Sequence, residues 1–118
     1  MILVDTSVWV AHLRHGTVGL EALLQEGRAL CHPFIVGELA CGNLENRSEI
    51  LSLLQALPAA IRAEHGEVMQ FIETHSLMRK GLGYIDVHLL ASARLTQVPL
   101  WTLDQKLHKA AAGLGLAP

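Results

Sequence analysis

Aromatic residues are scarce in this sequence, and it has no apolar run of membrane-spanning length. Only 4% of the 118 residues are aromatic. That scarcity excludes the ladder of stacking side chains with which many proteins hold single-stranded nucleic acid. The apolar runs fall short of the roughly 18 residues that a transmembrane helix needs. We therefore expect no membrane contact.

The sequence also has few cysteines, and it opens without a basic segment. Cys31 and Cys41 form no CxxC motif and lack the Cys–His spacing of a zinc site. Free thiols are typical of a reducing compartment. The chain opens without a basic segment and meets an acid at position 5, which argues against a secretory signal peptide. We expect a cytoplasmic protein.

Positive charge is limited as well. Nine Lys and Arg face eleven Asp and Glu, for a formal net charge of -2. Binding of nucleic acid by bulk positive charge is therefore excluded, and only local basic patches or bound cations could serve. The hydrophobic fraction of 51% and the length of 118 residues predict one folded domain over residues 1–118.

The pattern of apolar residues predicts short strands that alternate with helices. Strands are expected at 2–4, 29–31 and 98–102, with a weaker one at 59–61 and a short edge strand in the tail 113–118. Helices are expected at 8–15, 20–26, 33–41, 47–57, 64–80 (the longest), 85–97 and 104–112. Such alternation predicts an α/β fold: a single α/β/α layered domain with a short, mainly parallel sheet.

Acidic residues stand at the ends of apolar segments. The sequence has only three aspartates, and Asp5, Asp86 and Asp104 each follow such a segment. Glu38 is the one charged residue in the apolar stretch 34–41. A buried carboxylate is costly unless it is neutralised, paired or bound to a metal. We therefore expect these four acids in buried surroundings at one shared site.

Asp5 allows two interpretations. It follows a buried strand, and open parallel sheets bind ligands at the carboxyl ends of their strands. Alternatively, its side chain caps the following helix by accepting a hydrogen bond from the amide of Ser7 or Val8.

Four carboxylates at one place repel one another, and a divalent cation relieves that repulsion. Ligands that are all oxygen favour Mg²⁺ or Mn²⁺ over zinc. Such ions commonly serve phosphoryl transfer. The histidines do not have the HExxH-like spacing of a zinc hydrolase. His75 is expected in the core.

Four short motifs occur in order along nearly the whole chain. They are Leu-Val-Asp-Thr-Ser at 3–7, Glu-Leu-Ala-Cys-Gly at 38–42, the segment 83–93 around Asp86, and Leu-Trp-Thr-Leu-Asp at 100–104. With these motifs the sequence resembles the PIN domain, and in particular the VapC-type toxins of bacterial toxin–antitoxin pairs. The resemblance implies a PIN-like fold and a metal-dependent endoribonuclease.

The resemblance also implies roles for individual residues. Asp5, Glu38, Asp86 and Asp104 would form the acidic catalytic quartet. Mg²⁺ or Mn²⁺ would be held by Asp5, Asp86 and Asp104, while Glu38 orients or deprotonates the attacking water. The hydroxyls of Thr6, Ser7 and Thr102 would support the site. The implied partners are an RNA substrate, a cognate antitoxin protein and a second copy in a homodimer.

Two positions depart from the family pattern. Some members carry a further acid two residues after the position of Asp104, where this chain has Lys106. The residue before the proline at 33 is often Ser or Thr, and here it is His32.

Among the basic residues, Arg14 and Lys106 are predicted to contact RNA phosphates; Arg79, Lys80 and Arg94 are weaker candidates.

Two other functions compete with the nuclease. The first is a non-catalytic PIN-like module that only binds a partner, which has no need of all four acids. The second is a receiver-like phosphoryl-accepting domain. That fold needs paired acids near its amino end, whereas Asp5 stands alone there.

Overall fold

A short parallel sheet lies at the centre of the molecule. The computed structural model describes residues 1–118, and its three strands are β1 (Ile2–Val4), β2 (Ala29–Leu30) and β3 (Leu100–Trp101). They are ordered β2-β1-β3, and both pairings are parallel. Leu3 of β1 is in register with Leu30 on one side and Leu100 on the other. The most apolar strand thus takes the central position, where both faces are covered.

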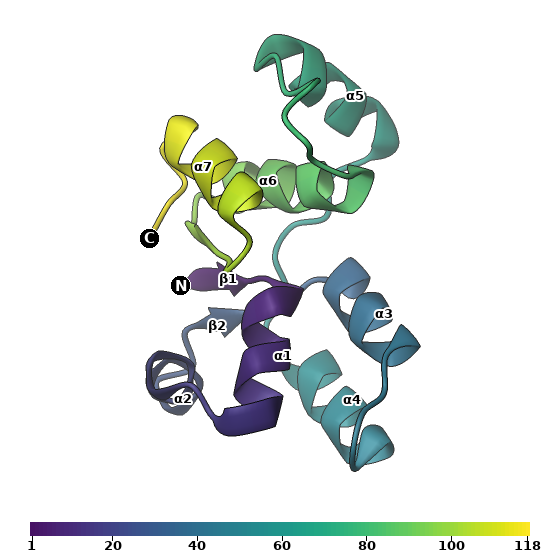
Figure 1. Ribbon diagram of the computed structural model, residues 1–118, viewed down its shortest axis with the longest axis vertical. Coiled ribbons are helices and arrows are strands. Elements are labelled where there is room, and N and C mark those ends of the chain that lie inside the picture. The colour runs from purple at the N-terminus through teal and green to yellow at the C-terminus, as the bar shows by residue number, and fades with distance from the viewer.

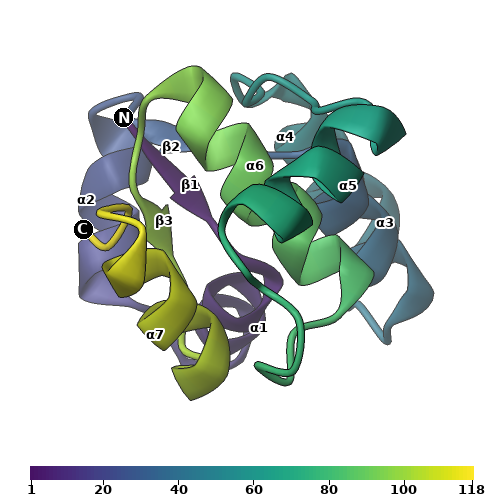
Figure 2. The same cartoon turned by 90° about the horizontal axis from the view of Figure 1, so that it is seen from above.

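Seven helices cover the sheet. Figure 1 shows α5, α6 and α7 on one side of it and α1 to α4 on the other, and Figure 2 shows the strands side by side between them. The α/β/α prediction is therefore confirmed. No helix has the combination of length and apolar character needed to cross a membrane. The helices are α1 (Thr6–His15), α2 (Val18–Gln25), α3 (Pro33–Cys41), α4 (Arg47–Ala56), α5 (His65–Thr74), α6 (Tyr84–Thr96) and α7 (Gln105–Gly113).

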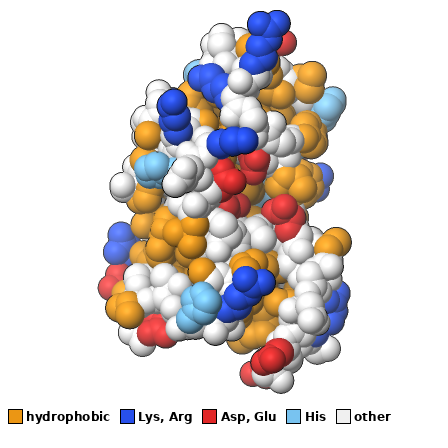
Figure 3. All heavy atoms as spheres, in the orientation of Figure 1, with side chains coloured by type: hydrophobic (Ala, Val, Ile, Leu, Met, Phe, Trp, Pro, Cys, Tyr) orange, Lys and Arg blue, Asp and Glu red, His pale blue; other side chains and the backbone are white.

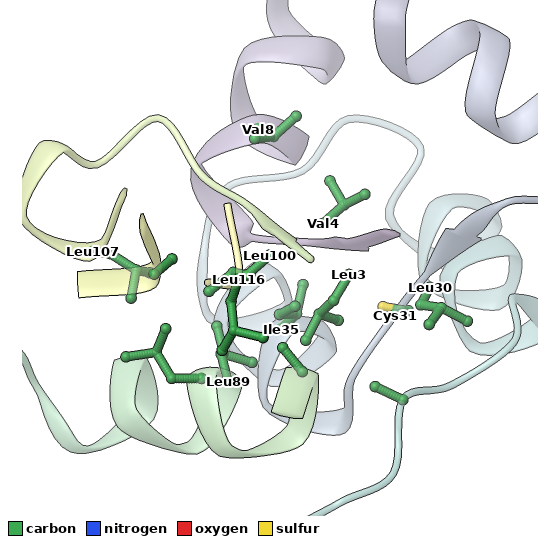
Figure 4. Packing of buried hydrophobic residues seen from close by; sticks show 14 of the residues in the cluster. Leu3, Val4, Val8, Leu30, Cys31, Ile35, Leu89, Leu100, Leu107 and Leu116 are labelled. Atoms are coloured by element: carbon green, nitrogen blue, oxygen red, sulfur yellow. The ribbon is translucent and has the colours of Figure 1, made fainter. Parts of the chain in front are cut away.

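The core is built from aliphatic side chains on both sides of the sheet. Leu3, Leu89 and Leu100 are fully buried, and Figure 4 shows them grouped with Ile35 and Leu116 around β1. The tail contributes through Leu116, whose carbonyl accepts a hydrogen bond from the amide of Leu100 at 2.8 Å. The tail therefore packs on β3, although the edge strand expected there does not form.

Two other predicted elements differ from the structure. The expected helix 64–80 ends at Thr74, because the chain turns at Ser76, whose φ is 52°. The longest helix is α6, with 13 residues. The expected strand at 59–61 is reduced to one bridge between Cys31 and Ala59. Prediction of the α5 end failed because neither glycine nor proline marks that turn.

Candidate active site

Asp5 is held at the carboxyl end of β1 by two hydroxyl groups. Its side chain is buried, with 6% exposed. Its Oδ2 accepts hydrogen bonds from Ser7 Oγ at 2.8 Å and from Thr102 Oγ1 at 2.7 Å. The side chain makes no capping hydrogen bond to α1, so the capping alternative is wrong. Oδ1 accepts no hydrogen bond from the chain and is free to bind a ligand.

The hydroxyls around Asp5 connect distant parts of the sequence. Ser7 Oγ lies 3.2 Å from Thr102 Oγ1 and accepts a hydrogen bond from the amide of Leu103 at 2.9 Å. Thr102 Oγ1 also accepts one from the amide of Asp104 at 3.1 Å. The start of α1 is thereby tied to the segment that links β3 to α7.

Glu38 approaches the site from α3. Its Oε1 accepts a hydrogen bond from Thr6 Oγ1 at 2.7 Å, and Thr6 is the residue next to Asp5. Oε2 makes no bond within the chain. The three hydroxyls named from the sequence, those of Thr6, Ser7 and Thr102, therefore each donate to one of the four acids.

Asp86 and Asp104 lie at the amino-terminal ends of two helices. Asp86 Oδ2 accepts a hydrogen bond from the amide of Gly83 at 2.9 Å in the first turn of α6. Asp104 Oδ1 accepts one from the amide of Leu107 at 2.9 Å and caps α7. Both carboxylates are stabilised by the positive end of a helix. In each, the second oxygen accepts no bond from the chain.

The charges of three aspartates meet at Asp86. Burial raises the pKa of the Asp86 carboxyl, and the nearby charges of Asp5 and Asp104 raise it further, against the opposing hydrogen bond from Gly83. Like charges that disfavour each other's ionisation mark a place where a cation is stabilised. Figure 3 shows acidic side chains gathered near the middle of this face, with basic side chains around them.

Burial of all four acids was a wrong expectation. Glu38 and Asp104 are exposed, Asp86 is half-buried, and only Asp5 is fully buried. The apolar composition of 34–41 misled, because α3 buries only Ile35 and Leu39 and exposes the stripe that carries Glu38. Exposure lets the acids reach a bound substrate.

The carboxylates fit Mg²⁺ better than an ion enclosed by protein ligands. No three His, Cys, Asp or Glu side chains stand close enough to hold a metal by themselves. Mg²⁺ keeps several waters and binds through one or two carboxylates together with substrate phosphates. Free oxygens on Asp5, Asp86 and Asp104, all without cationic partners, suit that coordination.

Comparison with known proteins identifies the architecture that holds these acids. The model of the PIN domain matches residues 2–113. This chain belongs to the PIN domain family. Ribonuclease VapC32 of Mycobacterium tuberculosis is 42% identical over 118 residues, which cover 99% of this chain and 95% of that protein, and the same values hold in two strains.

A solved structure shares the overall fold of this chain despite low sequence identity. The crystal structure of PAE2754 from Pyrobaculum aerophilum matches with a TM-score of 0.62 and 16% sequence identity. The match covers 92% of this chain and 78% of that one. At this identity, the likeness concerns the fold alone.

Glu38 of this PIN domain separates two surface hollows. A cavity of about 570 Å³ lies between α1, α3 and the loop before α4, and its wall includes Arg14, Asn43 and Asn46. A shallower hollow of about 450 Å³ lies on the other side, against Phe34 and Ile85. Arg14 is therefore near Glu38, whereas Lys106 belongs to a different cavity beside α7.

His32 anchors α3 beneath the site. It is 1% exposed, and its Nδ1 accepts a hydrogen bond from the amide of Phe34 at 3.0 Å while Nε2 lies 3.1 Å from Ser92 Oγ. His32 thus caps α3 at the position where the family pattern led us to expect Ser or Thr. Burial, together with the positive charges of His88 and Arg62, lowers the pKa of His32 to about 4.

Two other histidines were missed or misplaced from the sequence. His88 is buried in α6, with Nε2 at 2.9 Å from Tyr84 Oη, and burial lowers its pKa. His75 is not in the core as expected, because α5 has ended there and the ring is only partly covered by Phe71. The proline directly after position 32 was the signal that could have identified the His32 cap.

Proposed function

We propose that this protein is a metal-dependent endoribonuclease that acts as the toxin of a toxin–antitoxin pair. Membership of the PIN family and the 42% identity to a protein named Ribonuclease VapC32 support an RNA-cleaving toxin. The observation that carries the proposal is Asp5, fixed at the strand end by two hydroxyls with Oδ1 free, beside the charges of Asp86 and Asp104.

In this proposal, Asp5, Asp86 and Asp104 hold the cation, directly or through water. A bound Mg²⁺ or Mn²⁺ would neutralise the charge that develops on the phosphate. The hydroxyls of Ser7 and Thr102 keep Asp5 in one orientation, so little reorganisation accompanies binding. The helix ends at Asp86 and Asp104 fix the other two carboxylates in the same way.

Glu38 is the proposed base. Its Oε1 is held by Thr6 Oγ1, which leaves Oε2 to accept a proton from the attacking water. The water attacks the phosphodiester in line, its oxygen bonds to phosphorus, and the bond from phosphorus to the 3′ oxygen breaks. The departing 3′ oxygen takes up a proton from solvent. The products are a 5′-phosphate and a 3′-hydroxyl.

The proposal extends to partners that VapC-type proteins imply. A cognate antitoxin would silence the nuclease by covering the acids, and a basic side chain placed among them would take the position of the cation. We also propose a homodimer acting on RNA in the cytoplasm. Arg14, in the wall of the cavity beside Glu38, is proposed to contact a substrate phosphate.

Cleavage of total RNA by the purified protein tests the function. We expect discrete cuts in Mg²⁺ or Mn²⁺, none in EDTA, and at least a hundredfold loss in Asp5→Asn, as expected when charge stabilisation at the reacting phosphate is removed. Glu26→Gln is the matched control, because Glu26 is exposed and pairs only with Arg28. Equal cleavage by Asp5→Asn, or full cleavage in EDTA, would contradict the proposal.

A further inference from the structure

Four basic residues line one cavity beside the acids. The cavity has a volume of about 540 Å³ and lies between the segment after α5 and one face of α7. Its basic residues are Arg79, Lys80, Lys106 and Lys109, and we call the cavity the basic pocket. All three lysines of the chain are in it, and neither Asp nor Glu lines it. Nearly half of the positive charge of an acidic protein therefore faces one space.

The backbone builds this pocket from two segments. Lys106 and Lys109 are three residues apart on α7, so they project from the same face of the helix. Opposite them, the chain turns through Arg79 and Gly81, whose φ angles are 62° and 73°. A Cβ at Gly81 would lie 2.8 Å from Lys106 Cδ. Glycine therefore lets the turn pack closely on the Lys106 side chain.

The charges in the basic pocket are not neutralised. The only ion pair in the structure joins Arg28 to Glu26, far from this pocket in the sequence. Other arginines are engaged elsewhere: Arg94 bonds to the carbonyl of Leu114, and Arg47 to that of Gly42. The four side chains of the pocket make no hydrogen bond or ion pair within the chain. Mutual repulsion makes such a group a binding site for an anion.

The basic pocket and the acidic site are linked by α7. Asp104 caps α7, and Lys106 follows two residues later. From Asp104 to Lys109 the helix advances about 7.5 Å at 1.5 Å per residue. A polyanion with one charged group at the acids would thus bring neighbouring groups to the lysines. Figure 3 shows Lys and Arg side chains on the same face as acidic side chains.

We propose that the basic pocket binds the backbone phosphates of RNA next to the phosphate that is cut; this inference rests on the proposed function. Lys106, Arg79 and Lys80 were each candidates for phosphate contacts in the sequence, and the structure groups them with Lys109 in one cavity. The rest of the lining is His75, Leu77, Ala110, Gly113 and Leu114, in which the ring of His75 is the one polar side chain, so it offers few donors and acceptors for reading a base. The contact therefore positions RNA without selecting its sequence.

The test compares two double variants that remove equal charge. Lys106→Gln with Lys109→Gln removes both positive charges from one wall of the pocket. Arg28→Gln with Arg47→Gln is the control. The substrate is a single-stranded RNA 20-mer. Steady-state cleavage gives KM and kcat, and binding to the same RNA in EDTA is measured from 50 to 200 mM KCl.

For the pocket variant we expect KM to rise about tenfold at low salt, with kcat within twofold of wild type. The slope of log K against log salt should fall by about 1.4, because each phosphate contact on single strands contributes about 0.7. The control should change KM by less than threefold. Arg79→Gln with Lys80→Gln, in the opposite wall, should repeat the pocket result, and thermal melting verifies folding.

The outcomes separate this inference from the proposed function. If wild type cuts RNA and both pocket variants match the control in KM and salt slope, the basic pocket is not an RNA site although the nuclease stands. If wild type binds RNA through the pocket yet never cuts it, the nuclease fails and the pocket stands. The pocket would instead be a protein-binding site if the pocket variants lost binding to an acidic peptide while their binding to RNA stayed unchanged. That result would also overturn the inference.

Discussion

The acidic site and the basic pocket lie next to each other and are built in opposite ways. Every acid of the quartet accepts at least one hydrogen bond from the chain, and Asp5 accepts two. The four basic side chains of the pocket make no hydrogen bond or ion pair within the chain. Chemistry needs charges fixed within a fraction of an ångström, whereas backbone binding needs only charge that can follow a flexible polyanion. The two regions therefore predict different losses on mutation.

Glu38→Gln should give the largest effect on the acidic side of this comparison. The change keeps the size of the side chain and removes the proposed base, so kcat should fall by about 10² to 10⁴ with KM within threefold. Because Glu38 is exposed, the free energy of unfolding should change little. Single-turnover cleavage measures the rate. Glu45→Gln, in the same cavity wall, is the control, and its kcat should stay near that of wild type. A Glu38→Gln variant with a lower KM and an unchanged kcat would contradict the assignment of Glu38 as the base.

The anchor of α3 should make the protein sensitive to acid. His32 has a pKa of about 4 in the fold against 6.5 for an unperturbed histidine. Between these values the unfolded chain takes up a proton that the native protein does not, so stability is lost as pH falls from 6.5 to 4. The loss reaches at most about 3 kcal/mol. Urea unfolding from pH 7 to pH 4.5 measures it.

His32→Asn sharpens that test, because asparagine can cap α3 but does not titrate. The variant should lose stability more slowly with acid than wild type does. His108→Gln removes an exposed histidine and should leave the wild-type profile unchanged. Identical pH profiles for wild type and His32→Asn would show that His32 takes up its proton as readily in the folded protein.

Thr102→Val tests whether fixed hydrogen bonds matter to the acids. It removes the hydroxyl that donates to Asp5 and accepts from the amide of Asp104, at a buried position. A buried polar group left without its partner costs about 1 to 3 kcal/mol. We expect that loss in urea unfolding, and a kcat lowered about tenfold. Thr17→Val is the control, because the hydroxyl of Thr17 makes no capping hydrogen bond. Equal stabilities of the two variants would refute the role of Thr102.

Gly81→Ala should have the smallest effect, on the basic side. The φ of 73° disfavours alanine, and the new Cβ would press on Lys106. We expect a loss of about 1 kcal/mol in stability and a KM raised two- to threefold, with kcat unchanged. Gly27→Ala has a similar φ of 68° and open space around it, so it separates backbone strain from displacement of Lys106. Equal KM values for the two variants would contradict the contact.

The sequence predicted the framework of the site better than its surroundings. The apolar run at 2–4 identified the central strand, and proline at 33 the start of α3. The positions of the four acids in the chain were evident, but not their exposure, because the composition around Glu38 hid which face of α3 is buried. The basic pocket was not foreseen as one site. Lys80 and Lys109 meet only through tertiary packing, and each alone is indistinguishable from a solvated charge.

The Mg²⁺ dependence of cleavage tests the central claim, that Asp5, Asp86 and Asp104 hold the cation used to cut RNA. Single-turnover rates of wild type and Asp86→Asn would be compared from micromolar to tens of millimolar Mg²⁺. Asparagine can still accept the hydrogen bond from Gly83, so α6 keeps its start. We predict that Asp86→Asn needs more than tenfold higher Mg²⁺ for half-maximal rate. The same Mg²⁺ requirement in both proteins would contradict the account.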